Sequence, residues 1–278
     1  MADYIWNSSD GNFGAAGSYS PSSGPPAIND SITFDATSQY DVSSGLSALT
    51  GVDLERIWVT EDYEGNIGAD GNPLVVGVHN LIHNGQGSLF INSESHASNS
   101  HFVVDSPNEQ DALFIADTAG TLTLHLIRGG TTIADGVGSL TYVYVGGGGK
   151  TGNHLPTVDI GSGNSIGQYI QKSGYVTSKS MVNGLSTIID GGTFIYDAAS
   201  TANSVPPIII TGGNFVYNGT GTMSYMVVGS GGTLDMSQDS RAKAIGILVL
   251  LRGSNFVDNY NTTITTLTDL RGPVPVLP

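Results

Sequence analysis

The chain has 278 residues, of which 39 are glycine, 39% are hydrophobic and only 12% are charged. It contains no cysteine, which excludes disulfides, a thiol nucleophile and thiolate metal sites. Twenty-four acidic against nine basic residues give a net charge of −15, and this opposes direct binding to nucleic acid because phosphate contacts need Lys and Arg. The charge is compatible with solubility, with a basic protein partner or with cations.

No segment of the sequence indicates a membrane or an export signal. The opening Met1–Trp6 has neither a positively charged region nor an apolar one. The longest apolar run, Ile247–Leu251, is too short to span a bilayer. We therefore expect a protein that is made in the cytoplasm and that has no membrane partner.

Residues 1–40 predict an extended leader, because Ser20–Pro26 is rich in Ser, Gly and Pro and is followed by the short strand pattern Asp30–Phe34. The leader carries apolar side chains among polar ones: Tyr4, Ile5, Trp6 and Phe13. Such side chains suit an arm that docks on another chain, and we predict them as partner-binding residues. The alternative is that they cap the open end of the core that follows.

Two pairs of histidines are candidate metal ligands. His79 and His83 are four positions apart, and His96 and His101 are five apart. We expect the first pair to share one face of a strand or helix, but no His-Glu-x-x-His pattern accompanies either pair. The histidines are therefore predicted to lie on the surface or in turns, and neither a metal nor a cofactor is expected.

The central feature is a repeat in the C-terminal half. The phrase Gly-Gly-Thr-Phe-Ile-Tyr and its variants recur with a period of about twenty residues, which places a glycine at Gly192, Gly213, Gly232 and Gly253. Each copy has an apolar run, a glycine turn and a second apolar run of β-branched or aromatic residues, which are typical of strands. This period is too long for a heptad and too short for a two-helix repeat.

The repeat predicts an all-β protein with a parallel β-helix (β-solenoid) of about 18–22 residues per coil over residues 41–260. Glycines fit the corners, where a positive φ is needed and where a side chain would obstruct the next coil. Weaker copies extend the pattern towards the N-terminus, with a degenerate or looped stretch near Asn153–Gln171; they begin at Gly87, Gly120, Gly138 and Gly174.

Aromatic residues recur at equivalent places in the repeats: Phe194, Phe215 and Phe256, with Tyr196 and Tyr217 two positions after the first two. Residues two apart lie on the same face of a strand. We expect ladders of rings stacked inside the coil. The alternative is an exposed stripe that binds sugar or a second subunit.

Carboxylates near the repeats could belong to a glycosidase, which needs two of them on either side of a sugar. The candidates are Asp190, Asp197, Asp235 and Asp258. The repeat after Asp190 and Asp197 has Thr211 and Asn218 in their places, so the acid pair does not recur. We interpret these residues as turn formers and predict no catalytic residue.

Residues 261–278 predict a C-terminal strand and a proline-rich tail. Asn261–Leu267 has the composition of a strand, and Gly272–Pro278 is typical of an extended tail. The tail could latch a neighbouring subunit or end the chain.

Several segments together are similar to a known family. These are Tyr4–Phe13 with the prolines and Asn29–Phe34 that follow it, Pro73–Asn80, and His125–Thr132. They resemble the β-helical capsid decoration, or cement, proteins of tailed bacteriophages, including those of cyanophages. The resemblance implies a homotrimer in the virion, on the outer surface of the head, that binds the major capsid protein and performs no catalysis. The alternative is a trimeric tailspike or fibre domain that binds or cleaves host-surface glycan.

Overall fold

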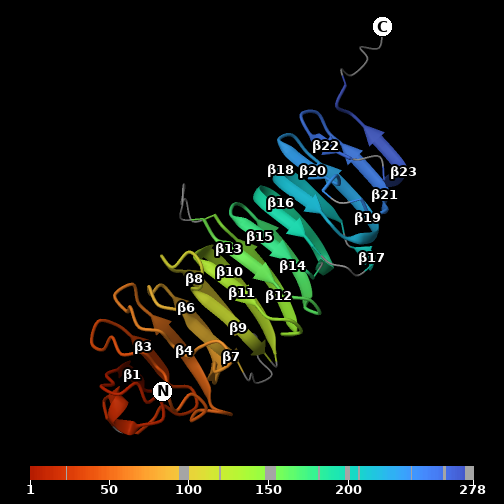
Figure 1. Ribbon diagram of the computed structural model, residues 1–278. Helices are drawn as coiled ribbons and strands as arrows, with labels where there is room; N and C mark the ends of the chain where they lie inside the picture. Colours follow the sequence, from red (N-terminus) through yellow and green to blue (C-terminus); the bar gives the residue numbers. More distant parts are fainter. Residues whose placement is uncertain are drawn as a thin grey trace.

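The computed structural model describes residues 1–22, 24–93, 100–118, 120–147, 155–180, 182–197, 201–205, 207–238, 240–258 and 261–272. Its strands stack into an elongated β-solenoid of about ten turns, with the first and last labelled strands, β1 (Asp3–Trp6) and β23 (Thr262–Asp269), at opposite ends (Figure 1). The predicted all-β parallel β-helix is confirmed. Within the described residues, no helix has the length and apolarity to cross a membrane.

The coils have two principal faces, each a ladder of parallel strands. We call them face 1 and face 2. Face 1 contains β1 (Asp3–Trp6), β3 (Ser31–Phe34), β4 (Asp53–Val59), β6 (Gly77–His83), β8 (Ser100–Asp105), β10 (Thr121–Arg128), β12 (Ser139–Val145), β14 (Ser165–Gln171), the first parts of β16 (Val182–Tyr196) and β18 (Ile208–Tyr217), β19 (Thr220–Val228), β21 (Lys243–Leu250) and β23 (Thr262–Asp269).

Face 2 contains β5 (Leu74–Val75), β7 (Leu89–Ser93), β9 (Leu113–Thr118), β11 (Gly130–Ile133), β13 (Thr157–Ile160), β15 (Tyr175–Ser178), the last parts of β16 and β18, β20 (Gly232–Asp235) and β22 (Asn255–Val257). The strand β17 (Thr201–Val205) pairs with the first half of β19. At the N-terminal end, β2 (Tyr19–Ser20) runs antiparallel to β1, and the short 3-10 helix η1 (Ala16–Ser18) precedes it.

The length of a coil follows from the central residues that pair along face 1. This column runs through Ile32, Ile57, Leu81, Phe102, Leu124, Val143, Tyr169, Thr187, Ile208, Met226, Leu248 and Leu267. The predicted length of about 18–22 residues holds for most coils. The coils that end at Ile57, Leu81 and Tyr169 are longer. In the first two, additional residues between the strands leave the coil as loops.

One predicted irregularity is corrected by the strand pairing. The stretch near Asn153–Gln171 contains β13 and β14, and both pair in parallel with the coils on either side. Residues 153 and 154 lie outside the described part of the chain. The weak sequence pattern reflects a long coil between Val143 and Tyr169, with a regular pair of strands inside it.

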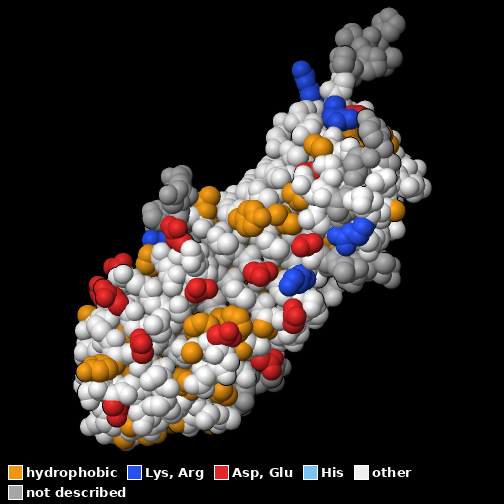
Figure 2. Space-filling view, in the orientation of Figure 1, with side chains coloured by type: hydrophobic (Ala, Val, Ile, Leu, Met, Phe, Trp, Pro, Cys, Tyr) orange, Lys and Arg blue, Asp and Glu red, His pale blue; other side chains and the backbone are white. Residues whose placement is uncertain are grey.

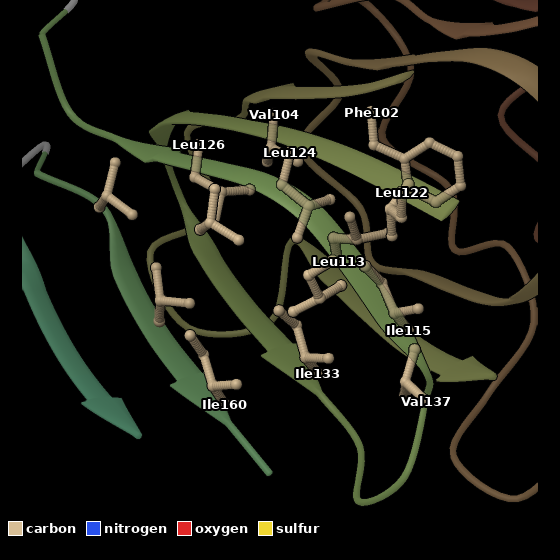
Figure 3. Close-up of a cluster of buried hydrophobic side chains, with 14 of the residues drawn as sticks. Phe102, Val104, Leu113, Ile115, Leu122, Leu124, Leu126, Ile133, Val137 and Ile160 are labelled. Carbon is tan, nitrogen blue, oxygen red and sulfur yellow. The ribbon is translucent and has the colours of Figure 1, made fainter. Parts of the chain in front are cut away.

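Apolar side chains from the two faces meet inside the coil. Figure 3 shows Phe102, Leu124 and Leu126 of face 1 together with Ile115 and Ile133 of face 2 in one buried cluster. The core therefore sits between the two faces and continues from coil to coil.

The predicted internal ladder of rings is confirmed for four residues. The rings of Phe194 and Phe215 stack with centroids 5.6 Å apart, and those of Tyr196 and Tyr217 with centroids 5.4 Å apart. All four are buried. In the next two coils the column continues with Leu234, which pairs with Phe215, and with Phe256, which pairs with Leu234 and is partly buried.

The corner glycines also behave as predicted. Gly192 and Gly213 have φ values of +72° and +71°, which L side chains rarely adopt. A Cβ on Gly213 would lie 2.6 Å from the backbone of both Gly191 and Gly192 in the preceding coil. Glycine therefore lets consecutive coils approach each other at this corner.

The ladder extends beyond residues 41–260 at both ends. β1 and β3 of the leader pair in parallel and form its first coil, and β23, predicted as Asn261–Leu267, pairs with β21 as its last strand. The solenoid therefore runs from Asp3 to Asp269. Residues 273–278 of the predicted tail lie outside the described residues.

Candidate interaction surface

A column of mainly apolar side chains runs along the outside of face 1. Each member lies between two inward residues of its strand, and each pairs with its counterpart in the next coil. We call this column the outer stripe: Trp58, Ile82, Val103, His125, Tyr144, Ile170, Ile188, Ile209, Val227 and Val249. Trp58 is 39% exposed and the others are partly exposed.

The outer stripe departs from the usual alternation of a half-buried strand, in which outward residues are polar. The corresponding outward column of face 2 does contain polar and charged side chains; it runs through Phe90, Phe114, Thr132, Asp159, Thr177, Ile195, Val216, Asp235 and Val257. Strands with apolar side chains on both faces are typical of sheets that are covered on both sides. The two faces therefore differ in what their outer surfaces can bind.

The stripe is widest in the C-terminal half of the solenoid. Three large apolar side chains on the face 1 strands beside it are exposed: Leu185 by 75%, Tyr225 by 36% and Ile247 by 41%. Tyr225 and Ile247 pair with each other in adjacent coils. Together with Ile209 and Val227 they extend the apolar surface sideways.

A cluster of rings occupies the middle of the stripe. The ring of His125 lies 6.4 Å from that of His101, 5.7 Å from that of Tyr142 and 5.9 Å from that of Tyr144. Burial, and secondarily the positive charge of a protonated His101, lower the pKa of His125 below its usual value. At neutral pH this cluster therefore adds no charge from His125 to the stripe.

Charged side chains at the ends of the face 1 strands form ion pairs between neighbouring coils. Arg128 Nε lies 2.9 Å from a carboxylate oxygen of Asp105, and Lys172 Nζ lies 2.6 Å from one of Asp190. The hydrogen bond from Lys172, and one from Thr211, lower the pKa of Asp190. The border of the stripe at these coils is thus locally neutral.

Charge is distributed unevenly along the chain. Residues 1–140 contain 17 acidic residues against two arginines, a net charge of −15, whereas residues 141–278 contain seven acidic and seven basic residues. Figure 2 shows the same trend on the visible face, with acidic side chains towards the N-terminal end and basic ones towards the middle and the C-terminal end. The widest part of the stripe therefore lies in the electrically balanced half.

The N-terminal end of face 1 has a groove of about 540 Å³ whose lining combines the polar side chains Asp3, Glu55, Arg56, Asn80 and His101 with Ile82 and Val103 of the outer stripe. Its polar groups are partly paired with one another. Arg56 lies 3.7 Å from Asp3 and 5.8 Å from the ring centroid of Trp58, and the Asn80 amide donates to Glu55 Oε1 at 3.2 Å. Carboxylates and amides beside an aromatic ring can hydrogen-bond and stack against a sugar.

Three of the four predicted partner-binding residues are inside the fold. Tyr4, Trp6 and Phe13 are at most 7% exposed, and the Trp6 ring packs on Phe13 and Tyr19 at 6.1 and 5.7 Å. This arrangement favours the alternative that they cap the core.

Ile5 differs from these three. It is 38% exposed and pairs with Thr33, which pairs with Trp58, so it lies in line with the outer stripe. Partner binding by this segment stays a prediction, and Ile5 is the residue that a partner could reach without opening the cap.

The histidine prediction needs a correction. His83 is 1% exposed and lies in the core, whereas His79 is partly exposed, so the two histidines do not form an exposed pair on one face. His101 lies on the outer surface of face 1, and His96 lies outside the described residues. In the described part of the chain, no group of three or more His, Asp or Glu side chains is placed to hold a metal ion.

The aspartates near the repeats are held by local hydrogen bonds. Asp235 accepts from the backbone and hydroxyl of Ser237 at 2.9 and 2.7 Å, as a turn-forming aspartate does. Asp258 accepts from Thr262 at 2.8 Å, and Asp190 is paired with Lys172. The contacts of Asp235 fit a turn former, whereas Asp190 lies within β16 and Asp258 directly follows β22.

Sequence reasoning missed the outer stripe, although a signal for it was present. Ile208–Ile210, Met226–Val228 and Leu248–Leu250 are unbroken apolar runs, and such runs indicate strands that are covered on both faces.

A scan against protein-family models, a search of curated proteins and a search of solved structures each found no match to this chain.

Proposed function

We propose that this protein is a structural component of a phage virion. In this proposal it is a capsid decoration, or cement, protein that stands on the outer surface of the head as a homotrimer and stabilises contacts between major capsid proteins. It performs no catalytic step. The observation that supports the proposal best is the outer stripe, a long apolar surface on a solenoid whose repeated coils suit side-by-side contact.

The solenoid suits a mechanical role. Consecutive coils are joined by parallel strand pairing on both faces, and the buried side chains form one continuous cluster from Tyr4 to Leu250. Such repeat structures gain stability from each interface between neighbouring coils. A rod of this kind can span neighbouring capsid subunits and resist deformation.

The charge distribution suits binding at one end. The acidic half, residues 1–140, would attract a basic surface and would leave the balanced half free for contact between copies. In this arrangement the acidic half, including the exposed Ile5, faces the major capsid protein. The phage setting itself comes from the sequence segments that resemble decoration proteins.

The proposal is tested by the copy number of the chain in purified virions, measured by quantitative mass spectrometry against the major capsid protein. Abundance comparable to that of the capsid protein supports decoration. A few tens of copies would assign the chain to a tailspike or fibre instead. Absence from virions would refute both functions.

The groove beside Trp58 favours one second candidate, a tailspike or fibre domain that binds host-surface glycan. Its lining holds carboxylates, an amide and a histidine, and one lining residue, Arg56, lies over the ring of Trp58. Calorimetric titration of the protein with purified host-surface polysaccharide tests this second candidate. Binding that is lost in Asn80→Ala and Trp58→Ala but kept in Tyr175→Ala, an exposed aromatic on face 2, would support this candidate, and no heat of binding would refute it.

A further inference from the structure

We infer that the outer stripe of face 1, in the half of the solenoid after residue 140, is the surface through which copies of this chain pack side by side. The inference rests on the proposed function and deepens its homotrimer by naming the surface that makes it. The occupant is a second copy of the chain.

The first argument is the composition of the outward positions. From Ile170 to Val249, five successive coils present only Ile or Val in the outer stripe, and none of these side chains is fully buried in the single chain. Beside them, Leu185 and Ile247 are exposed. An apolar surface of this length on a soluble protein is typical of a contact with another protein.

The second argument is the spacing of the stripe. Adjacent strands of a sheet lie about 4.8 Å apart, so the stripe repeats an apolar side chain at that distance along a line. If a partner presents side chains in a line with the same spacing, they can pack between the side chains of the stripe at every coil. Another copy of this solenoid supplies such a surface, and an irregular partner does not.

The third argument is charge. Two copies that met through residues 1–140 would bring net charges of −15 together, which is unfavourable, whereas residues 141–278 have seven charges of each sign. The charges at the border of the stripe are paired within the chain, as Lys172 is with Asp190. Contact between copies along the C-terminal half is therefore not opposed by the net charge of that half.

The area of this half of the stripe is close to that of a stable interface. Its six coils, from Tyr144 to Val249, at about 4.8 Å each give a length of roughly 29 Å. The stripe together with one flanking outward column on each side, at a spacing of about 7 Å, gives a width of about 20 Å. The surface is then roughly 600 Å² on each chain, which approaches the ~800 Å² per partner of a standard stable interface. In a trimer each chain has two neighbours, so flanking residues such as Leu185 and Tyr225 would be covered as well.

The test is the oligomeric state of the purified full-length chain, measured by light scattering after size-exclusion chromatography. We expect the mass of three chains for the wild type and of one chain for the double variant Ile209→Lys and Val249→Lys. The matched control is Ile195→Lys with Val257→Lys, two outward positions on face 2, which should keep the mass of three chains. A monomeric wild type, or a double variant that keeps the wild-type mass, would overturn the inference.

A second measurement guards against variants that fail to fold. The chain has no cysteine, so single cysteines can be placed at will. Under mild oxidation, Ile209→Cys should form covalent dimers through the stripe and Ile195→Cys should not. Equal cross-linking at the two positions, or cross-linking only at Ile195→Cys, would contradict the inference. Both measurements use isolated protein, so their failure is distinct from absence of the chain in virions.

Discussion

The imidazole of His83 lies inside the solenoid with its Nε2 atom 3.1 Å from the carbonyl oxygen of Gly87. It occupies an inward column of face 1 between Val59 and Val104, so its neighbours above and below are apolar. Burial lowers the pKa of His83 to about 4, because a charged imidazolium in the core would lose its hydration. The folded protein therefore holds this histidine neutral.

This relationship predicts acid-sensitive stability. The unfolded chain takes up a proton at His83 near pH 6.5 but the folded chain only near pH 4, so the free energy of unfolding should fall as the pH falls through this window. The loss should reach about 3 kcal/mol when both forms are protonated. Denaturant unfolding of the wild type and of His83→Leu between pH 7.5 and pH 4 measures it. The variant should lack this part of the pH dependence, and an unchanged slope would show that His83 is not its source.

The rings of His101 and His125 predict a pH-dependent association. Protonation of His125 places a charge in the middle of the stripe, close to the rings of His101 on β8 and of Tyr142 and Tyr144 on β12. The described contacts of His125 include no carboxylate that would balance this charge. His125 pairs with Tyr144 one coil before the proposed packing surface, so its protonation would place a charge at the edge of that surface. We expect the proposed trimer to dissociate as the pH falls from 7.5 to 5.

Light scattering across this pH range, with His125→Phe as the comparison, tests the prediction. The variant should stay associated at the pH at which the wild type dissociates. His79→Phe, which alters a partly exposed histidine outside the stripe, is the control and should behave as the wild type. If His125→Phe dissociates at the same pH as the wild type, another group controls association.

Substitutions at Trp6 and at Ile5 test two roles of the leader separately, its contribution to folding and its docking on a partner. Trp6 is fully buried against Phe13, Tyr19 and Phe34, so Trp6→Ala should lower the free energy of unfolding by about 3–5 kcal/mol. Ile5 is exposed, so Ile5→Asp should change stability little. Thermal melts measure the first effect, and binding to capsids that lack the protein measures the second. Loss of capsid binding in Ile5→Asp at full stability would support docking by the leader, and full occupancy would contradict it.

Gly213 and Gly231 distinguish crowding between coils from backbone strain. Both have positive φ, but a Cβ on Gly213 would meet the preceding coil and one on Gly231 would meet nothing within 4 Å. Gly213→Ala should therefore destabilise the fold by roughly 2–4 kcal/mol and Gly231→Ala by about 1 kcal/mol. Denaturant midpoints of the two variants test this order. Equal losses would mean that coil-to-coil contact at Gly213 has little weight.

The candidate surface could be recognised only in part from the sequence. The runs Ile208–Ile210 and Leu248–Leu250 predict strands that are covered on both sides, but a run alone does not say which residue points outward. The leader shows the same difficulty. Tyr4 and Trp6 alternate with Ile5 as a strand requires, yet which of the two sets faces the core depends on their pairing with β2 and β3.

Glycine spacing and β-branched runs are local properties of the chain, and they were enough to predict a parallel β-solenoid, its approximate coil length and the internal ladder of Phe194 and Phe215. They are sufficient because a coil needs a corner residue with positive φ and strands with apolar inward positions, and both are visible one repeat at a time. The outer stripe, the buried position of His83 and the cap around Trp6 depend instead on register between coils. Register joins residues of neighbouring coils that are far apart in the sequence, and a shift of one position would exchange the inner and outer faces, so only the tertiary structure decided them.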